Sequence, residues 1–214
     1  ELKDRTGQQL SLYCLHVADI LVDLEMDDET ITAAVLYRLV SNDKLSRDDM
    51  RERYGERVAG LIDDLIRIQK LSPGVLTDRE SKGEEHSENL RRMLLGIASD
   101  IRALLIQLAE RVHLMRRLGH LDEALQQQFS RNTRDIFAPI ANRLGIWQVK
   151  WELEDLALRF LDPDSYRTIA KKLEERRDER LAFIARVIGT LEQLFSENGI
   201  EARISGRPKH IFSI

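Results

Sequence analysis

The chain contains little cysteine, glycine, proline or aromatic residue. Cys14 is its one cysteine in 214 residues, which excludes a disulfide framework and a cysteine zinc site, and its apolar surroundings indicate a small buried side chain. With 11 Gly, 4 Pro and 6% aromatic residues, a turn-rich sheet protein is disfavoured. The 33% charged and 43% hydrophobic content favours long helices with solvated faces around a sizeable core.

Long apolar runs are also missing from the sequence. No stretch reaches the length that crosses a bilayer, and no signal peptide is visible at Glu1, so we expect a cytoplasmic protein that does not use a membrane. The net charge of -4 argues against a general electrostatic attraction to nucleic acid, although local basic patches stay possible.

Helical periodicity runs through most of the chain. A loop is expected at 72–88, where charges, Pro and Gly replace apolar residues, and alternation at 200–204 predicts a strand. The dense apolar pattern of 90–118 predicts helices buried on more than one side. The other expected helices cover about 10–24, 28–42, 46–71, 121–144 with a kink at Pro139, 147–161, 164–177 and 180–198.

Two motifs are more specific than this periodicity. The first runs from Ile136 to Ile146 and continues from Lys150 to Leu156, and the second runs from Gly206 to Ile214. The first resembles the signature of the long RelA/SpoT homologues, which make and degrade the alarmone (p)ppGpp. The second resembles the opening motif of that family's synthetase domain.

The resemblance implies an all-α fold, an HD-domain-like helical bundle, with a helical connector and the first strand and motif of an α/β synthetase domain at the C-terminus. We expect a degenerate HD-type domain at 1–160, the connector at 161–199 and the start of the synthetase domain at 200–214. Because the first residue is not Met and a new pattern opens near Gly206, we expect an N-terminal piece of a longer protein.

In that family the HD domain is a hydrolase. One manganese ion, held by two His and two Asp, activates the water that removes the 3′-pyrophosphate of the alarmone. By the resemblance, the metal ligands fall at Tyr13, Tyr37, Arg38 and Glu110, the Glu-Asp pair that assists hydrolysis at Ser41 and Asn42, and a nucleotide-pocket Asn at Leu114. Of these side chains, only Glu110 still offers a metal-binding group.

The cation at position 38 decides whether manganese binds. At about 4 Å and an effective dielectric of about 20, two unit charges repel by roughly 4 kcal/mol, which is about 8 kcal/mol against a divalent ion. We therefore predict that manganese is lost and that the chain resembles the RelA-type branch, whose hydrolase domain is inactive.

The same position leads to a hypothesis about packing. If positions 38 and 110 converge as they would around a metal, Arg38 and Glu110 form a buried ion pair that replaces the ion as a bridge between two helices. The alternative is that Arg38 extends to solvent and Glu110 caps a loop.

Other conspicuous residues have plainer explanations. For His16, His113 and His120 we expect structural roles, because none has a second His or carboxylate where the family would use one. Trp147 and Trp151 lie one helical turn apart, which favours core or interface packing over nucleotide stacking.

The second motif implies contacts with ATP in the intact synthetase. By the resemblance, Arg207 stacks on adenine, and Lys209 and Ser213 reach phosphate. Mg²⁺ would serve the intact synthetase, while this fragment would use no cofactor. The implied partners are its own synthetase domain, ATP and GTP or GDP, and, through C-terminal regions outside this chain, the ribosome and uncharged tRNA.

Three functional hypotheses follow. The first is a catalytically inactive hydrolase region with a regulatory and structural role in a (p)ppGpp synthetase, which transfers pyrophosphate from ATP to the 3′-hydroxyl of GTP or GDP. The second is an active manganese-dependent (p)ppGpp 3′-pyrophosphohydrolase. The third is a regulatory module whose pocket binds a guanine nucleotide or a protein.

Overall fold

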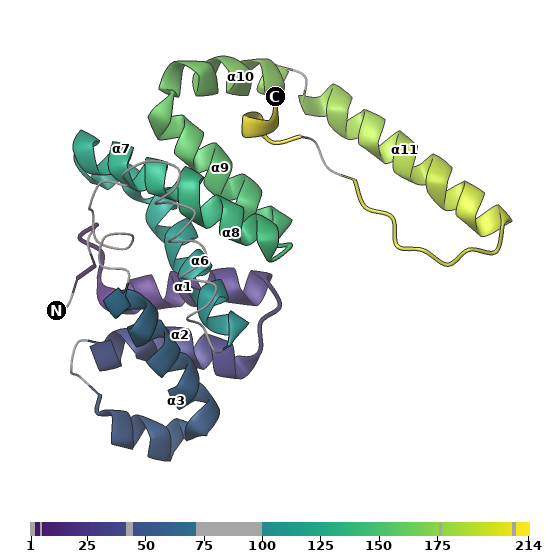
Figure 1. Ribbon diagram of the computed structural model, residues 1–214. Coiled ribbons are helices and arrows are strands. Elements are labelled where there is room, and N and C mark those ends of the chain that lie inside the picture. Colours follow the sequence, from purple (N-terminus) through teal and green to yellow (C-terminus); the bar gives the residue numbers. More distant parts are fainter. Residues whose placement is uncertain (1–2, 5, 42–44, 72–99, 176, 207–208) are drawn as a thin grey trace. The chain divides into compact units, whose positions relative to one another are not determined.

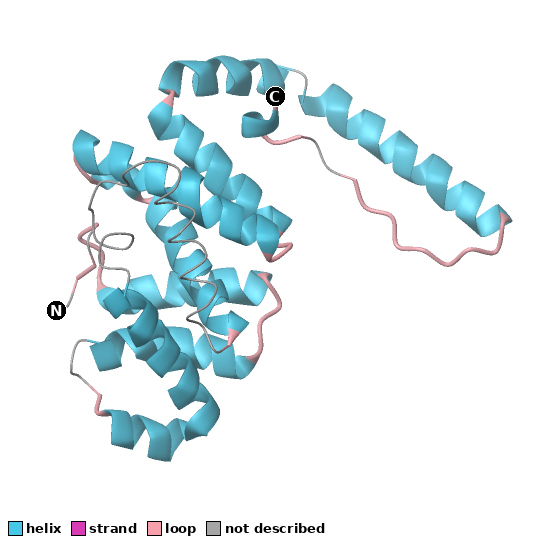
Figure 2. Ribbon diagram, in the orientation of Figure 1, coloured by secondary structure: helices cyan, strands magenta, loops and turns pink. Residues whose placement is uncertain are grey.

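The described part of the chain folds into helices and loops. The computed structural model describes residues 3–4, 6–41, 45–71, 100–175, 177–206 and 209–214. Within these ranges no strand is formed beyond an isolated bridge between Lys3 and Gln9, so the predicted all-α class is confirmed (Figure 2). The expected loop at 72–88 and the expected helix over 90–99 lie outside the described residues.

The chain divides into two compact units, Glu1–Leu161 and Asp162–Ile214. This division rests on compactness, so the functional limits at 1–160, 161–199 and 200–214 stay a prediction. The first unit contains α1 (Leu10–Asp23), α2 (Asp28–Ser41), α3 (Arg47–Leu71), α6 (Ile101–Arg116), η1 (Leu118–His120), α7 (Glu123–Asn132), η2 (Thr133–Phe137), α8 (Ala138–Arg143) and α9 (Trp147–Leu161) (Figure 1).

Side-chain caps fix where helices of this unit begin. The Asp27 carboxylate accepts a hydrogen bond from the Thr30 amide at 2.8 Å, just before α2. The Ser46 hydroxyl accepts one from the Asp49 amide at 3.1 Å, which confirms the capped start predicted for α3. Inside α3 the helix is interrupted at Gly55, whose φ of 85° and ψ of 168° are far from helical values and suit a residue without Cβ.

The helix predicted over 121–144 is present with a local change of pitch. It runs as α7, a π-helical segment over Thr133–Phe137 and α8. The π segment ends at Phe137, two residues before Pro139, which has no N–H to give to the preceding turn, so a widened turn lies near the position of the predicted kink. Gly145, at a φ of 74°, ends α8 as expected.

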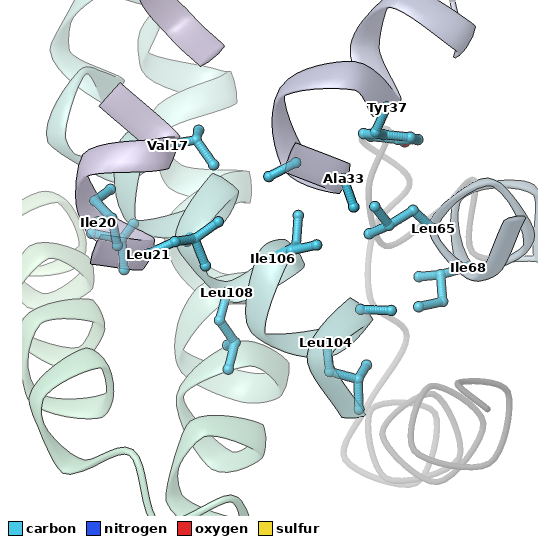
Figure 3. Packing of buried hydrophobic residues seen from close by; sticks show 14 of the residues in the cluster. Val17, Ile20, Leu21, Ala33, Tyr37, Leu65, Ile68, Leu104, Ile106 and Leu108 are labelled. Carbon is cyan, nitrogen blue, oxygen red and sulfur yellow. The ribbon is translucent and has the colours of Figure 1, made fainter. Parts of the chain in front are cut away.

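The core of the first unit surrounds α6. This helix contacts α1, α2, α3 and α9, and most of its residues are buried. In Figure 3, Ile106 of α6 lies between Leu21 of α1 and Leu65 of α3, and Leu108 lies below Leu21 in the same view. The helices predicted over 90–118 were expected to be buried on more than one side, and for 101–116 this is confirmed.

The second unit contains α10 (Pro163–Glu175), α11 (Arg177–Glu197) and η3 (Ile211–Ser213), close to the helices predicted there. The strand predicted at 200–204 is wrong, because this segment has no regular secondary structure. A strand requires a neighbouring strand for its backbone hydrogen bonds, and no described residue supplies one.

Among the described helices, none is both long and apolar enough to cross a membrane.

The packing of α1 is tested by two substitutions of the same type. Leu21 is 0% exposed and Leu15 is 59% exposed. Leu21→Ala should lower the free energy of unfolding by about 2–5 kcal/mol, because it leaves a cavity, and Leu15→Ala should change it by less than about 0.5 kcal/mol. Urea denaturation of both variants measures the difference; equal losses would contradict this placement of α1.

Candidate functional site

The structure brings most of the predicted site positions to one cavity. Tyr13, Tyr37, Arg38, Glu110 and Leu114 all line a cavity of about 210 Å³ in the first unit. The other lining residues are Lys3, Asp4, Leu10, Gln69, Gln107, Arg111 and Phe137.

The predicted Glu-Asp pair is not part of this cavity lining. Ser41 is exposed at the end of α2, and its hydroxyl donates to the carbonyl oxygen of Arg38 at 3.3 Å. Asn42 lies outside the described residues. The cavity is therefore formed by the positions on α1, α2 and α6.

Arg38 and Glu110 form the ion pair that was one of the two hypotheses about these positions. The Nε of Arg38 donates to Oε1 of Glu110 at 2.8 Å, and Nη2 lies 2.7 Å from the same oxygen. Nη2 also donates to the Tyr13 hydroxyl at 2.9 Å, and that hydroxyl donates to Oε1 of Glu110 at 2.8 Å. The outward Arg38 and the loop-capping Glu110 are therefore wrong.

Burial and neighbouring charges set the protonation of Arg38 and Tyr13. Glu110 is 8% exposed, so its carboxylate depends on the guanidinium for charge compensation. Burial lowers the pKa of Arg38, but attraction from Glu110 and from the phenols of Tyr13 and Tyr37 offsets it, so this pKa lies above its ordinary value. Burial and the Glu110 charge raise the pKa of Tyr13 well above its usual range, so its hydroxyl keeps its proton.

Neighbouring residues that the sequence did not single out complete the cluster. Gln107 donates from Nε2 to Oε2 of Glu110 at 2.9 Å, one helical turn away, a spacing that is visible in the sequence. The Tyr37 hydroxyl donates to Oε1 of Gln69 on α3 at 2.7 Å, a contact between distant segments that no local pattern indicates.

Arg111 is a further cavity residue that the sequence analysis passed over. Its side chain is buried, and its Cζ lies 3.9 Å from the centre of the Phe137 ring. The signal available in the sequence was its place directly after Glu110, one of the expected metal positions.

The side chains at the expected metal positions do not fit a divalent ion. The expected metal positions offer one carboxylate that is already bonded to a guanidinium, and protonated phenols where imidazole nitrogens would be needed. No group of at least three His, Cys, Asp or Glu side chains is arranged to hold a metal within the described part of the chain.

The histidines have structural surroundings. His113 donates from Nε2 to Oε1 of Gln8 at 2.9 Å, and Nε2 of Gln8 donates to Nδ1 of His16 at 2.8 Å. The rings of His16 and His113 stack with centres 5.3 Å apart, a proximity that the sequence analysis did not foresee. His120 is exposed in η1.

The two tryptophans stack on each other at the start of α9, with ring centres 6.2 Å apart. Trp147 is 49% exposed, so it is not a core residue. Their possible role at an interface stays a prediction.

The residues expected to contact ATP belong to the second unit. Lys209 is exposed, and the Ser213 hydroxyl donates to the carbonyl oxygen of His210 at 2.8 Å. Arg207 lies outside the described residues, so its expected stacking on adenine stays a prediction.

The buried His113 predicts a dependence of stability on pH. Burial, aided by the charges of His16, Arg117 and Arg116 and opposed by Asp4, lowers its pKa from 6.5 to about 4. The unfolded chain therefore binds this proton more tightly, so the contribution of His113 to stability is complete above pH 6.5 and is lost, by up to about 3 kcal/mol, as the pH falls to about 4.

His113→Gln, whose amide nitrogen can take the place of Nε2, should remove this part of the pH dependence. Urea denaturation of both proteins between pH 7 and pH 4 measures it, and an unchanged slope in the variant would contradict the assignment.

Comparison with known proteins agrees with this architecture. The HD domain family matches residues 1–147. The chain is 39% identical over 203 residues to a GTP pyrophosphokinase of Escherichia coli strain K12, covering 94% of this chain and 27% of that protein. It is 38% identical over 211 residues to a probable guanosine-3′,5′-bis(diphosphate) 3′-pyrophosphohydrolase of Synechocystis, covering 98% of this chain and 27% of that protein.

A third relative carries both activities in its name. The bifunctional (p)ppGpp synthase/hydrolase SpoT of Escherichia coli strain K12 is 35% identical over 209 residues, covering 98% of this chain and 29% of that protein. The chain thus spans between 27% and 29% of the length of these relatives. By its HD-domain match and its similarity to these enzymes along nearly its whole length, the chain belongs to the RelA/SpoT family, as its HD region.

Proposed function

We propose that this chain is a catalytically inactive hydrolase region of a RelA-type (p)ppGpp synthetase, with a regulatory and structural role. The intact enzyme would transfer pyrophosphate from ATP to the 3′-hydroxyl of GTP or GDP. In this proposal the region packs against its own synthetase domain and biases the equilibrium between that domain's active and inactive states.

One observation carries the proposal. The Arg38 guanidinium lies within hydrogen-bond distance of Glu110, the one carboxylate left among the expected metal ligands. A divalent ion at that carboxylate would be repelled by roughly 8 kcal/mol at about 4 Å and an effective dielectric of about 20. The hydrolytic water of the family is activated by such an ion, so its loss removes the chemistry.

The remaining parts of the proposal follow from family membership. ATP would contact Arg207, Lys209 and Ser213 in the intact protein, with Mg²⁺ as the metal of the synthetase reaction. The ribosome and uncharged tRNA would act through other regions of the longer protein, in the cytoplasm.

The third hypothesis, a regulatory module whose cavity binds a ligand, also has support from the structure. It is favoured by the cavity itself, where Arg38, Arg111 and Lys3 supply cationic groups next to the apolar Leu114 and Phe137. Titration calorimetry with ppGpp and with GTP, without added metal, tests this role, and heat changes that saturate would support it.

The hydrolase assay tests the main proposal. With ppGpp and Mn²⁺, the 214-residue chain should release no pyrophosphate above the rate of a metal-free blank, because the ion lacks a site. Glu110→Gln is the matched variant. Turnover by the unmodified chain that disappears in Glu110→Gln would establish the second hypothesis, an active manganese-dependent hydrolase, in place of this one.

A restored ligand set provides the positive control. The combined variant Tyr13→His, Tyr37→His, Arg38→Asp and Glu110→Asp should gain Mn²⁺ binding in titration calorimetry, because it returns imidazole and carboxylate donors to the helices that surround the cavity. The unmodified chain should give no such binding. Equal Mn²⁺ binding by both proteins would contradict the assignment of these positions.

A further inference from the structure

The Arg38 side chain joins three helices of the first unit. From α2 it donates to Glu110 on α6 at 2.8 Å and to Tyr13 on α1 at 2.9 Å. We propose that the guanidinium of Arg38, a cation covalently attached to α2, joins α1, α2 and α6 in place of a divalent ion. The packing of these three helices then does not require metal. We call this guanidinium the tethered cation. This inference rests on the proposed loss of metal and adds what replaced it.

The first argument concerns the hydrogen bonds of Glu110. Its Oε1 accepts from the Tyr13 hydroxyl and from Arg38, and its Oε2 accepts from Gln107 at 2.9 Å. Both oxygens of this buried carboxylate are therefore engaged, as a buried charge requires. A metal ion would have to displace these donors before it could bind.

The second argument concerns the aromatic rings close to the cation. The Arg38 Cζ lies 5.0 Å from the centre of the Tyr13 ring and 5.2 Å from the centre of the Tyr37 ring. These rings stand where the family pattern has His ligands. Aromatic faces attract a planar guanidinium, whereas imidazole nitrogens bind a metal through their lone pairs.

The substitutions at positions 13, 37 and 38 therefore work together. Tyr13 offers both a ring face and a hydroxyl to Arg38, and the Tyr37 ring is held in place by its hydrogen bond to Gln69 on α3 at 2.7 Å. Two nearby aromatic rings and a donor that uses two nitrogens suit a guanidinium, so lysine at position 38 should not replace arginine.

Thermal unfolding of the 214-residue chain tests the inference. The melting temperature should be the same with EDTA and with excess Mn²⁺. Arg38→Met should lower it by roughly 6–12 °C, because a buried carboxylate loses its cation, and Arg38→Lys should recover little of this loss. The control is Arg57→Met, which breaks the exposed pair of Arg57 and Glu29, 3.4 Å apart, and should have little effect.

A double-variant cycle separates charge compensation from simple packing. The loss in Arg38→Met combined with Glu110→Leu should be smaller than the sum of the two single losses, since neither buried charge is then left alone. If Arg38→Met does not fold, the cycle is measured with Tyr13→Phe and Glu110→Gln, which remove the bridging hydroxyl and the negative charge.

The outcomes distinguish this inference from the proposed function. A melting temperature that Mn²⁺ raises would overturn both. Arg38→Met or Arg38→Lys as stable as the unmodified chain, or additive losses in the cycle, would overturn the tethered cation alone. Manganese-dependent ppGpp hydrolysis would likewise overturn both, because the ion would then occupy the place assigned to Arg38. Hydrolysis of ppGpp in the presence of EDTA, by a chain whose Arg38→Met variant still unfolds earlier, would overturn the proposed function alone.

Discussion

The need to neutralise the buried carboxylate of Glu110 is the constraint on which the arrangement of the first unit depends. A carboxylate that is 8% exposed is tolerated only with a cation and hydrogen-bond donors around it. Arg38 supplies the cation from α2, Tyr13 a donor from α1 and Gln107 a donor from α6 itself. The relative placement of these helices is thus fixed by an electrostatic requirement as well as by packing.

Helix α6 carries this requirement into the core. It is buried against several helices, yet it holds Gln107, Glu110, Arg111 and His113 as buried polar residues. Glu110, Arg111 and His113 have contacts in distant parts of the chain, with Arg38, with the ring of Phe137 and with Gln8 respectively, whereas Gln107 donates to Glu110 on the same helix. Buried polar groups that need partners from several segments allow few arrangements of those segments. Apolar contacts alone would allow many more arrangements.

Most of the helices and several of the site residues could be predicted from the sequence, and each wrong or missing prediction has a physical cause. Periodicity located the helices because burial of one face is a local property of the chain, and the capped start at Ser46 was visible for the same reason. The strand at 200–204 was wrong because strand formation depends on a partner that no local pattern reveals. Gln69 was missed because its contact with Tyr37 spans two helices.

The sequence by itself determined the all-α class, the family and the residue types at the expected metal positions, since these follow from local periodicity and from motifs read position by position. It left open whether Arg38 turns inward or toward solvent, because both conformations suit a long cationic side chain on a helix. Only the tertiary structure decided this, by bringing Glu110 and Tyr13 from remote helices within hydrogen-bond distance of the guanidinium.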